Sequence, residues 1–163
     1  MRATWAPKGK TPVLTHHFNW KRLSMVSVLG YAPDGSDAFL VFGMNPGTYN
    51  DERLIEFLEA FHAELADDKV TLIWDGLMSH RSKVMTAWVK QHRSWLRVER
   101  LPSYAPDLNP VEPVWGNLKS TELANYCPDT IDEAEVVADA GLQRIGGDAD
   151  LCRAFLRHAG LSL

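Results

Sequence analysis

The sequence predicts an α/β domain, and three of its features lead to this prediction. A β-hairpin pattern comes first, helix and strand patterns then alternate, and the strand in the middle is an unbroken apolar run. The chain has 163 residues, of which 45% are hydrophobic and 23% charged, values typical of one soluble globular domain with its own core. We therefore expect a single domain over residues 1–163, built on a mixed sheet that helices cover on both faces.

The hairpin is predicted from two apolar runs on either side of a turn signal. Residues 23–31 are apolar with small residues between them, and residues 38–42 form the return strand. The residues between them include Pro33, Asp34 and Gly35, which favour a tight turn. Asn45, Pro46 and Gly47 are expected to end the second strand. Residues 1–20 form an irregular basic lead-in.

An amphipathic helix over residues 50–66 follows the hairpin. Asn50 is a suitable N-cap, and Asp51 and Glu52 in the first turn carry the charge that the helix dipole favours there. Apolar residues then recur at helical spacing, at Leu54, Ile55, Leu58, Phe61 and Leu65.

A strand–helix–strand segment comes next. Residues 70–74 are β-rich without alternation, which predicts a strand buried on both faces. Residues 82–92 are predicted to form a helix that buries its apolar side and exposes basic residues, and residues 96–101 form the next strand. Three helices complete the chain, over residues 110–124, 130–145 and 150–158, and the residues from about 128 onward are an acidic helical part.

The helix at residue 110 begins with a pattern that has two interpretations. Asn109 is a good N-cap, Pro110 suits the first helical position, and Glu112 falls at the third, so Asn109 and Glu112 fit a capping box. Thr130 and Glu133 fit a second one. Alternatively, a carboxylate at a helix start beside a loop is placed to bind a metal ion, and the spacing alone does not decide between these interpretations.

Residues 102–115, PSYAPDLNPVEPVW, resemble the signature around the last acid of DDE transposases, the mariner-like elements and the related bacterial insertion-sequence transposases. In that family the final Glu of the catalytic triad takes the place of Glu112. The preceding Asp ends a strand upstream, and LIWDG at residues 72–76 supplies it as Asp75, with 36 residues between the two acids. The resemblance covers roughly residues 2–124.

The resemblance implies a ribonuclease H-like fold and a metal-dependent endonuclease that cleaves DNA and transfers the strand. Asp75 and Glu112 would be catalytic residues and ligands of Mg²⁺ or Mn²⁺, whose hard character suits carboxylate oxygens. His80 and Asn109 would support them. Asp75 also has a simpler interpretation, because Asp-Gly after a strand is a common turn whose carboxylate bonds backbone amides.

The sequence departs from the family at its beginning. Residues 1–33 contain no Asp or Glu, so the first acid and the strand that carries it are absent, as is the family's DNA-reading region. We therefore expect an incomplete catalytic domain that forms a homodimer to shield its open strand edges. The alternative is a catalytically dead transposase remnant that binds nucleic acid or promotes oligomerisation.

The resemblance implies DNA as the partner, whereas the net charge of −4 argues weakly against it and the distribution of charge matters more. The basic segments are compatible with phosphate binding, but they also fit ordinary solvated faces. Basic residues gather in residues 1–33 and 79–100, and the expected phosphate contacts are Arg81, Lys83, Lys8, Lys10, Lys21 and Arg22. Without the DNA-reading region, DNA binding is expected to be weak, independent of sequence and sensitive to salt. The longest apolar run is too short to cross a bilayer, and Cys127 and Cys152 form no metal-binding pattern. We expect a cytoplasmic protein without a membrane partner.

Overall fold

The computed structural model describes residues 6–10, 22–65, 68–102 and 105–162. The described chain forms β1 (Leu23–Tyr31), β2 (Ala38–Pro46), α1 (Asp51–Glu64), β3 (Val70–Trp74), η1 (Ser79–Arg81), α2 (Lys83–Gln91), β4 (Leu96–Arg100), η2 (Pro106–Leu108), α3 (Glu112–Ser120), α4 (Ile131–Gly146) and α5 (Ala149–His158). The α/β class and the predicted order of elements are confirmed. The boundaries agree within a few residues, except that β2 is longer and α3 shorter than predicted.

The strands form two separate pairs. β1 and β2 are antiparallel, with Leu23 opposite Pro46 and Tyr31 opposite Ala38. β3 and β4 are parallel, with Val70 opposite Leu96. Within the described residues neither pair extends into the other, so the strands expected in one mixed sheet lie in two two-stranded sheets.

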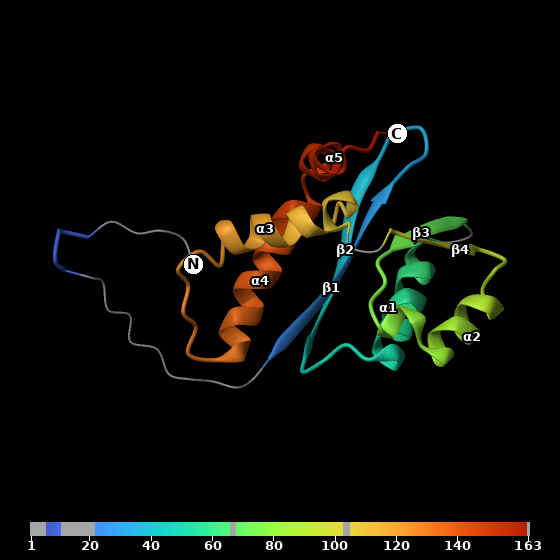
Figure 1. Cartoon of the computed structure of the whole chain (residues 1–163), viewed down its shortest axis with the longest axis horizontal. Coiled ribbons are helices and arrows are strands. Elements are labelled where there is room, and N and C mark those ends of the chain that lie inside the picture. The colour runs from blue at the N-terminus through green and yellow to red at the C-terminus, as the bar shows by residue number, and fades with distance from the viewer. Residues whose placement is uncertain (1–5, 11–21, 66–67, 103–104, 163) are drawn as a thin grey trace.

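Each strand pair has its own helices and its own core (Figure 1). We call β1, β2, α3, α4 and α5 the hairpin half, and α1, β3, α2 and β4 the β–α–β half. Figure 1 shows the hairpin between them, with α3–α5 on one side and the β–α–β half on the other. Val26 of β1 packs against the core of the β–α–β half, so the two halves meet at that strand.

The core of the hairpin half holds most of the large side chains that are fully buried in the described chain. They are Val114, Leu118, Leu142, Ile145 and Cys152. The helices α3 and α4 approach closely at Gly141, where an added Cβ would lie only 2.4 Å from Leu118 Cδ1. Gly141 is therefore required for this helix contact.

The core of the β–α–β half is covered from one side. Leu72 and Trp74 of β3 are buried with Leu58 of α1 and Met85 of α2. The next residue along the strand, Ile73, is 57% exposed. The prediction that residues 70–74 are buried on both faces is therefore wrong. α1 and α2 both lie below β3 and β4 in Figure 1, so they cover the same face of this sheet.

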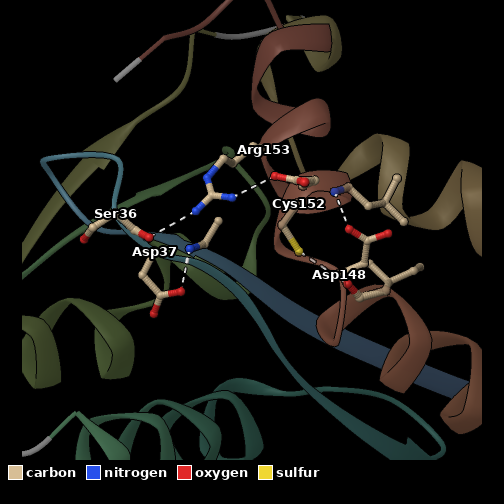
Figure 2. Close-up of polar contacts among 9 residues, drawn as sticks. Ser36, Asp37, Asp148, Cys152 and Arg153 are labelled. Carbon is tan, nitrogen blue, oxygen red and sulfur yellow. Dashed lines mark hydrogen bonds and ion pairs between the residues drawn. The ribbon is translucent and has the colours of Figure 1, made fainter.

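The hairpin turn is fastened to α5 (Figure 2). Arg153 of α5 donates a hydrogen bond from Nη2 to the Ser36 carbonyl (3.1 Å) and pairs through Nη1 with Asp150 (3.0 Å). The Tyr31 hydroxyl donates to the Cys152 carbonyl (3.0 Å). Burial, and to a smaller extent the nearby Cys152, raises the pKa of Tyr31 to about 12.

None of the helices in the described part of the chain has both the length and the apolar character that a membrane crossing requires.

Candidate active site

Asp75 follows directly on the last residue of β3. Its Oδ1 accepts a hydrogen bond from the backbone N–H of Leu77 (2.9 Å), which is the bond that the turn interpretation predicts. The side chain nevertheless remains 49% exposed, and within the described residues no hydrogen bond reaches Oδ2. Asp75 thus shapes the turn with one oxygen and presents the other to solvent.

His80 holds the Asp75 carboxylate from a second direction. Its Nδ1 lies 2.9 Å from Asp75 Oδ1 and 3.3 Å from the Asp75 carbonyl oxygen. The imidazole ring stacks on the Trp74 indole with ring centroids 4.4 Å apart and planes 4° from parallel. Because its ring is fixed by Trp74, His80 orients Asp75.

Asn109 and Glu112 lie at the entry to α3, but the predicted capping box is wrong. The helix begins at Glu112, with Val111 as the N-cap and no side-chain cap hydrogen bond. Asn109 Oδ1 accepts from the N–H of Val111 (3.2 Å), two residues on, as in an Asx turn. The N–H of Asn109 donates to the Pro106 carbonyl in η2 (2.9 Å), so it does not bond Glu112. The reciprocal bond of the capping box is therefore absent. The Glu112 side chain is exposed and accepts no hydrogen bond within the described residues.

The two acids belong to different halves of the molecule. Asp75 is carried by β3 of the β–α–β half, whereas Glu112 starts α3, whose Val114 and Leu118 are buried in the hairpin half. In Figure 1 the C-terminal ends of β3 and β4 point toward the hairpin, and the chain enters α3 on that side. The two acids are therefore carried by separately packed halves, and the distance between them depends on how the halves are held together.

The donor atoms at this site suit a hard divalent cation in kind, although not in number. Asp75 Oδ2 and the Glu112 carboxylate are exposed carboxylate oxygens, which Mg²⁺ prefers. In the described residues no three His, Cys, Asp or Glu side chains gather closely enough to hold a metal ion. Asp75 and Glu112 would thus supply two ligands, and water or phosphate oxygens would supply others.

The basic residues predicted to contact DNA lie at several places on the surface. Arg81 ends η1 and Lys83 begins α2, both exposed and both within a few residues of Asp75. Arg22 is exposed just before β1. Lys8 and Lys10 are exposed in the short described stretch 6–10, and Lys21 lies outside the described residues.

Sequence reasoning missed two exposed apolar side chains beside Asp75. Leu77 is 59% and Met78 77% exposed, in the turn that the Asp75 carboxylate stabilises. The guanidinium of Arg81 lies 3.6 Å from the Met78 sulfur. The sequence did hold a signal for them. Leu77 and Met78 are an apolar pair between a strand and a helix, and the pair fits neither the two-residue period of a strand nor the 3.6-residue period of a helix.

Comparisons with known proteins identify the family and the fold. A family model described as DDE superfamily endonuclease matches residues 1–133. None of the curated proteins compared with the chain matches it. Among solved structures, the Mos1 mariner paired-end complex with Mn is similar at a TM-score of 0.63 and 17% identity, covering 98% of this chain and 46% of that one.

Two further solved structures are similar. The Mos1 transposase paired-end complex with the left transposon end has a TM-score of 0.64 at 16% identity, again covering 98% of this chain and 46% of that one. The Mos1 transposase catalytic domain with raltegravir and Mg has a TM-score of 0.51 at 15% identity, covering 86% and 84%. At these identities the likeness shows the fold, and the chain spans about half the length of the transposase in the paired-end complexes.

Proposed function

Because the chain belongs to the DDE superfamily of endonucleases, we propose that it is part of a transposase catalytic domain that cleaves and joins DNA phosphodiester bonds. Asp75 and Glu112 are the acids of this site. The observation that carries the proposal is the state of the Glu112 carboxylate. It stands at the first residue of α3 beside a loop, is exposed, and accepts no hydrogen bond within the described residues.

The chain's own residues prepare the site in three ways. Leu77 N–H and His80 fix one oxygen of Asp75 and leave the other free. The Asn109 side chain accepts from the N–H of Val111 and so shapes the turn that leads into Glu112. Arg81 and Lys83 offer positive charge for the phosphates that flank the reacting bond.

Mg²⁺ or Mn²⁺, the metals named for the Mos1 structures, suits Asp75 and Glu112 as oxygen ligands. When bound, such a cation would stabilise the charge that develops on the attacking and leaving oxygens.

We further propose that a strand carrying a third acid completes the site between β1 and β3. Each of these strands pairs with one neighbour only within the described residues. Val26 of β1 packs against the other half's core, so the two free edges belong to neighbouring strands. An unpaired strand edge favours the addition of a strand, either from a longer form of the polypeptide or from a second copy in a homodimer.

The metal site is tested by thermal unfolding with and without Mn²⁺. The double variant D75N/E112Q should lose any rise in Tm that Mn²⁺ gives the unaltered chain. The charge-matched control E56Q/D132N changes exposed acids away from the site and should keep that rise. An equal rise in all three proteins would refute Asp75 and Glu112 as ligands.

Activity is tested by nicking of duplex DNA with Mn²⁺. We expect no cleavage by residues 1–163, and cleavage by a version extended upstream with an Asp-bearing strand. Inactivity of both, together with intact DNA binding, would instead support the catalytically dead remnant. Light scattering addresses the homodimer, since a stable monomer at micromolar concentration would contradict it.

A further inference from the structure

A second basic site lies at the opposite end of the β3–β4 sheet from Asp75. It is a surface hollow of about 260 Å³, whose charged lining consists of Lys69, Arg93 and Arg97, with Ser94 and Trp95 between them. We call it the basic hollow. None of its cations is among the phosphate contacts predicted from the sequence.

The position of the basic hollow separates it from the candidate active site. Lys69 precedes β3, and Arg97 lies opposite Thr71 near the start of β4. Asp75 follows the other end of β3. Five strand residues at about 3.3 Å each put roughly 16 Å between the two sites.

The floor of the basic hollow is held rigidly. Trp95 is only 9% exposed, and its indole stacks on His62 with ring centroids 3.8 Å apart and planes 10° from parallel. The Trp88 ring meets the same indole edge-on at 6.1 Å. The Trp95 carbonyl accepts from Val70 N–H (2.8 Å), which ties the floor to β3. These contacts fix the backbone that carries Arg93 and Arg97.

The net charge of the hollow is positive. Lys69 and Arg93 are exposed, and neither forms an ion pair within the part of the chain that the structure describes. Arg97 is paired with Glu99 (2.7 Å) on the same strand. Among the described residues, the nearby acids are Glu99, which Arg97 neutralises, and the exposed Asp68 beside Lys69. The described side chains therefore leave at least one positive charge unpaired for an anion.

We propose that the basic hollow binds backbone phosphates of duplex DNA, away from the acids. This rests on the proposed function in so far as that function makes DNA the partner. The volume lies below the roughly 300–1,000 Å³ usual for pockets that enclose a whole small molecule, so a phosphate group fits it better. A duplex carries a phosphate charge about every 1.7 Å of its axis, so one turn of DNA is long enough to reach both sites.

The test is duplex binding by the full chain at several salt concentrations, with a labelled duplex of random sequence. The variant K69Q/R93Q removes the two unpaired cations. The control K119Q/R157Q removes two exposed cations from α3 and α5 and changes the net charge equally. We expect K69Q/R93Q to weaken binding on the order of tenfold or more and to lower the salt slope by about two, with the control unchanged.

Equal binding by K69Q/R93Q and the unaltered chain would overturn the inference while leaving the proposed function standing, and so would an equal loss in the control. If the unaltered chain binds no duplex at any salt concentration, both the inference and DNA as a partner fall. The thermal-unfolding test of D75N/E112Q with Mn²⁺ does not depend on these binding results, so it tests the proposed metal site independently.

Inorganic phosphate distinguishes a DNA contact from a small-anion site. Amide NMR signals of Ser94 and Trp95 should shift with micromolar duplex and only with millimolar phosphate. Saturation by micromolar phosphate would assign the hollow to a free anion and overturn the DNA proposal.

Discussion

The two halves of the molecule bury their apolar residues to different degrees. In the hairpin half, α4 and α5 close over β2, and five side chains of the core are fully buried. In the β–α–β half, α1 and α2 cover one face of the sheet, and Ile73 on the other face is 57% exposed. An apolar strand can be buried on both faces, but the elements that pack against it determine how many of its faces are buried.

The largest expected effect comes from a cavity-forming substitution in the core of one half, with its consequences compared in both halves. Leu142 and Met85 are both fully buried, one in each half. We expect L142A and M85A each to lower the free energy of unfolding by about 3 kcal/mol, because each leaves a cavity. Urea unfolding measures this loss.

Two probes show whether the damage stays in one half. Cys152 is fully buried in the hairpin half, so its reaction with a thiol reagent in a C127S background reports opening there. With Trp5, Trp20 and Trp115 replaced by Phe, the remaining Trp74, Trp88 and Trp95 give the β–α–β half its own fluorescence signal. L142A should speed the labelling of Cys152 more than M85A does. Equal labelling rates would mean that the halves open together.

A smaller effect is expected from the ion pair that fastens α4 to the end of α3. Arg144 donates from Nε to Glu122 (2.6 Å) and from Nη2 to Asn117 (2.6 Å). We expect R144Q to cost about 1 kcal/mol, because the pair is partly exposed. R157Q, an exposed change on α5, is the control.

The pH dependence of this pair follows from the hydrogen bond of Arg144, which lowers the pKa of Glu122. The stabilisation is complete above the unfolded pKa of Glu, about 4.3, and is lost as the pH falls through the lower folded pKa. The stability difference between the unaltered chain and R144Q should therefore shrink in acid. A difference that stays constant down to pH 2 would contradict this.

Tyr31→Phe should have a similar or slightly smaller effect at neutral pH. It removes the hydrogen bond to the Cys152 carbonyl, which is worth about 1 kcal/mol. The folded pKa of Tyr31 is raised to about 12, so its contribution is complete below the unfolded pKa of about 10 and is lost as the pH rises through 12. Unfolding at pH 8 and pH 11 should show a steeper alkaline loss for the unaltered chain than for Y31F.

The smallest effect is expected at Ile73. Because this side chain is mostly exposed, I73T should change the free energy of unfolding by no more than about 0.5 kcal/mol. A loss above 1 kcal/mol would show that another part of the protein, or a second copy, covers this face in solution.

The elements were predictable because their signals are local. The Asn50 side chain caps α1 as the sequence predicts, and the strand over residues 70–74 has the predicted bounds. The burial of that strand was not predictable, because an unbroken apolar run does not say whether its second cover belongs to the same chain. The capping box of Asn109 and Glu112 was wrong, because α3 begins two residues later than predicted, at Glu112, and η2 takes the N–H of Asn109.

The candidate site shows the same limit. Asp75 and Glu112 are identifiable from their motifs, and the roles assigned to them stay predictions. Their distribution over two separately packed halves is a tertiary property, and no local pattern encodes it. The basic hollow joins Lys69 to Arg93 and Arg97 across two parallel strands, so it appears only once the register of β3 and β4 is known.

The division into halves also has a consequence for synthesis on the ribosome. The β–α–β half comes from one continuous stretch, residues 51–100, whereas the hairpin half combines residues 22–46 with residues 112–158. At about 5–20 residues per second, the apolar side of the hairpin waits roughly ten seconds for α4 and α5 to emerge. We expect the nascent chain to complete its middle first, and to present the uncovered hairpin to chaperones during that interval.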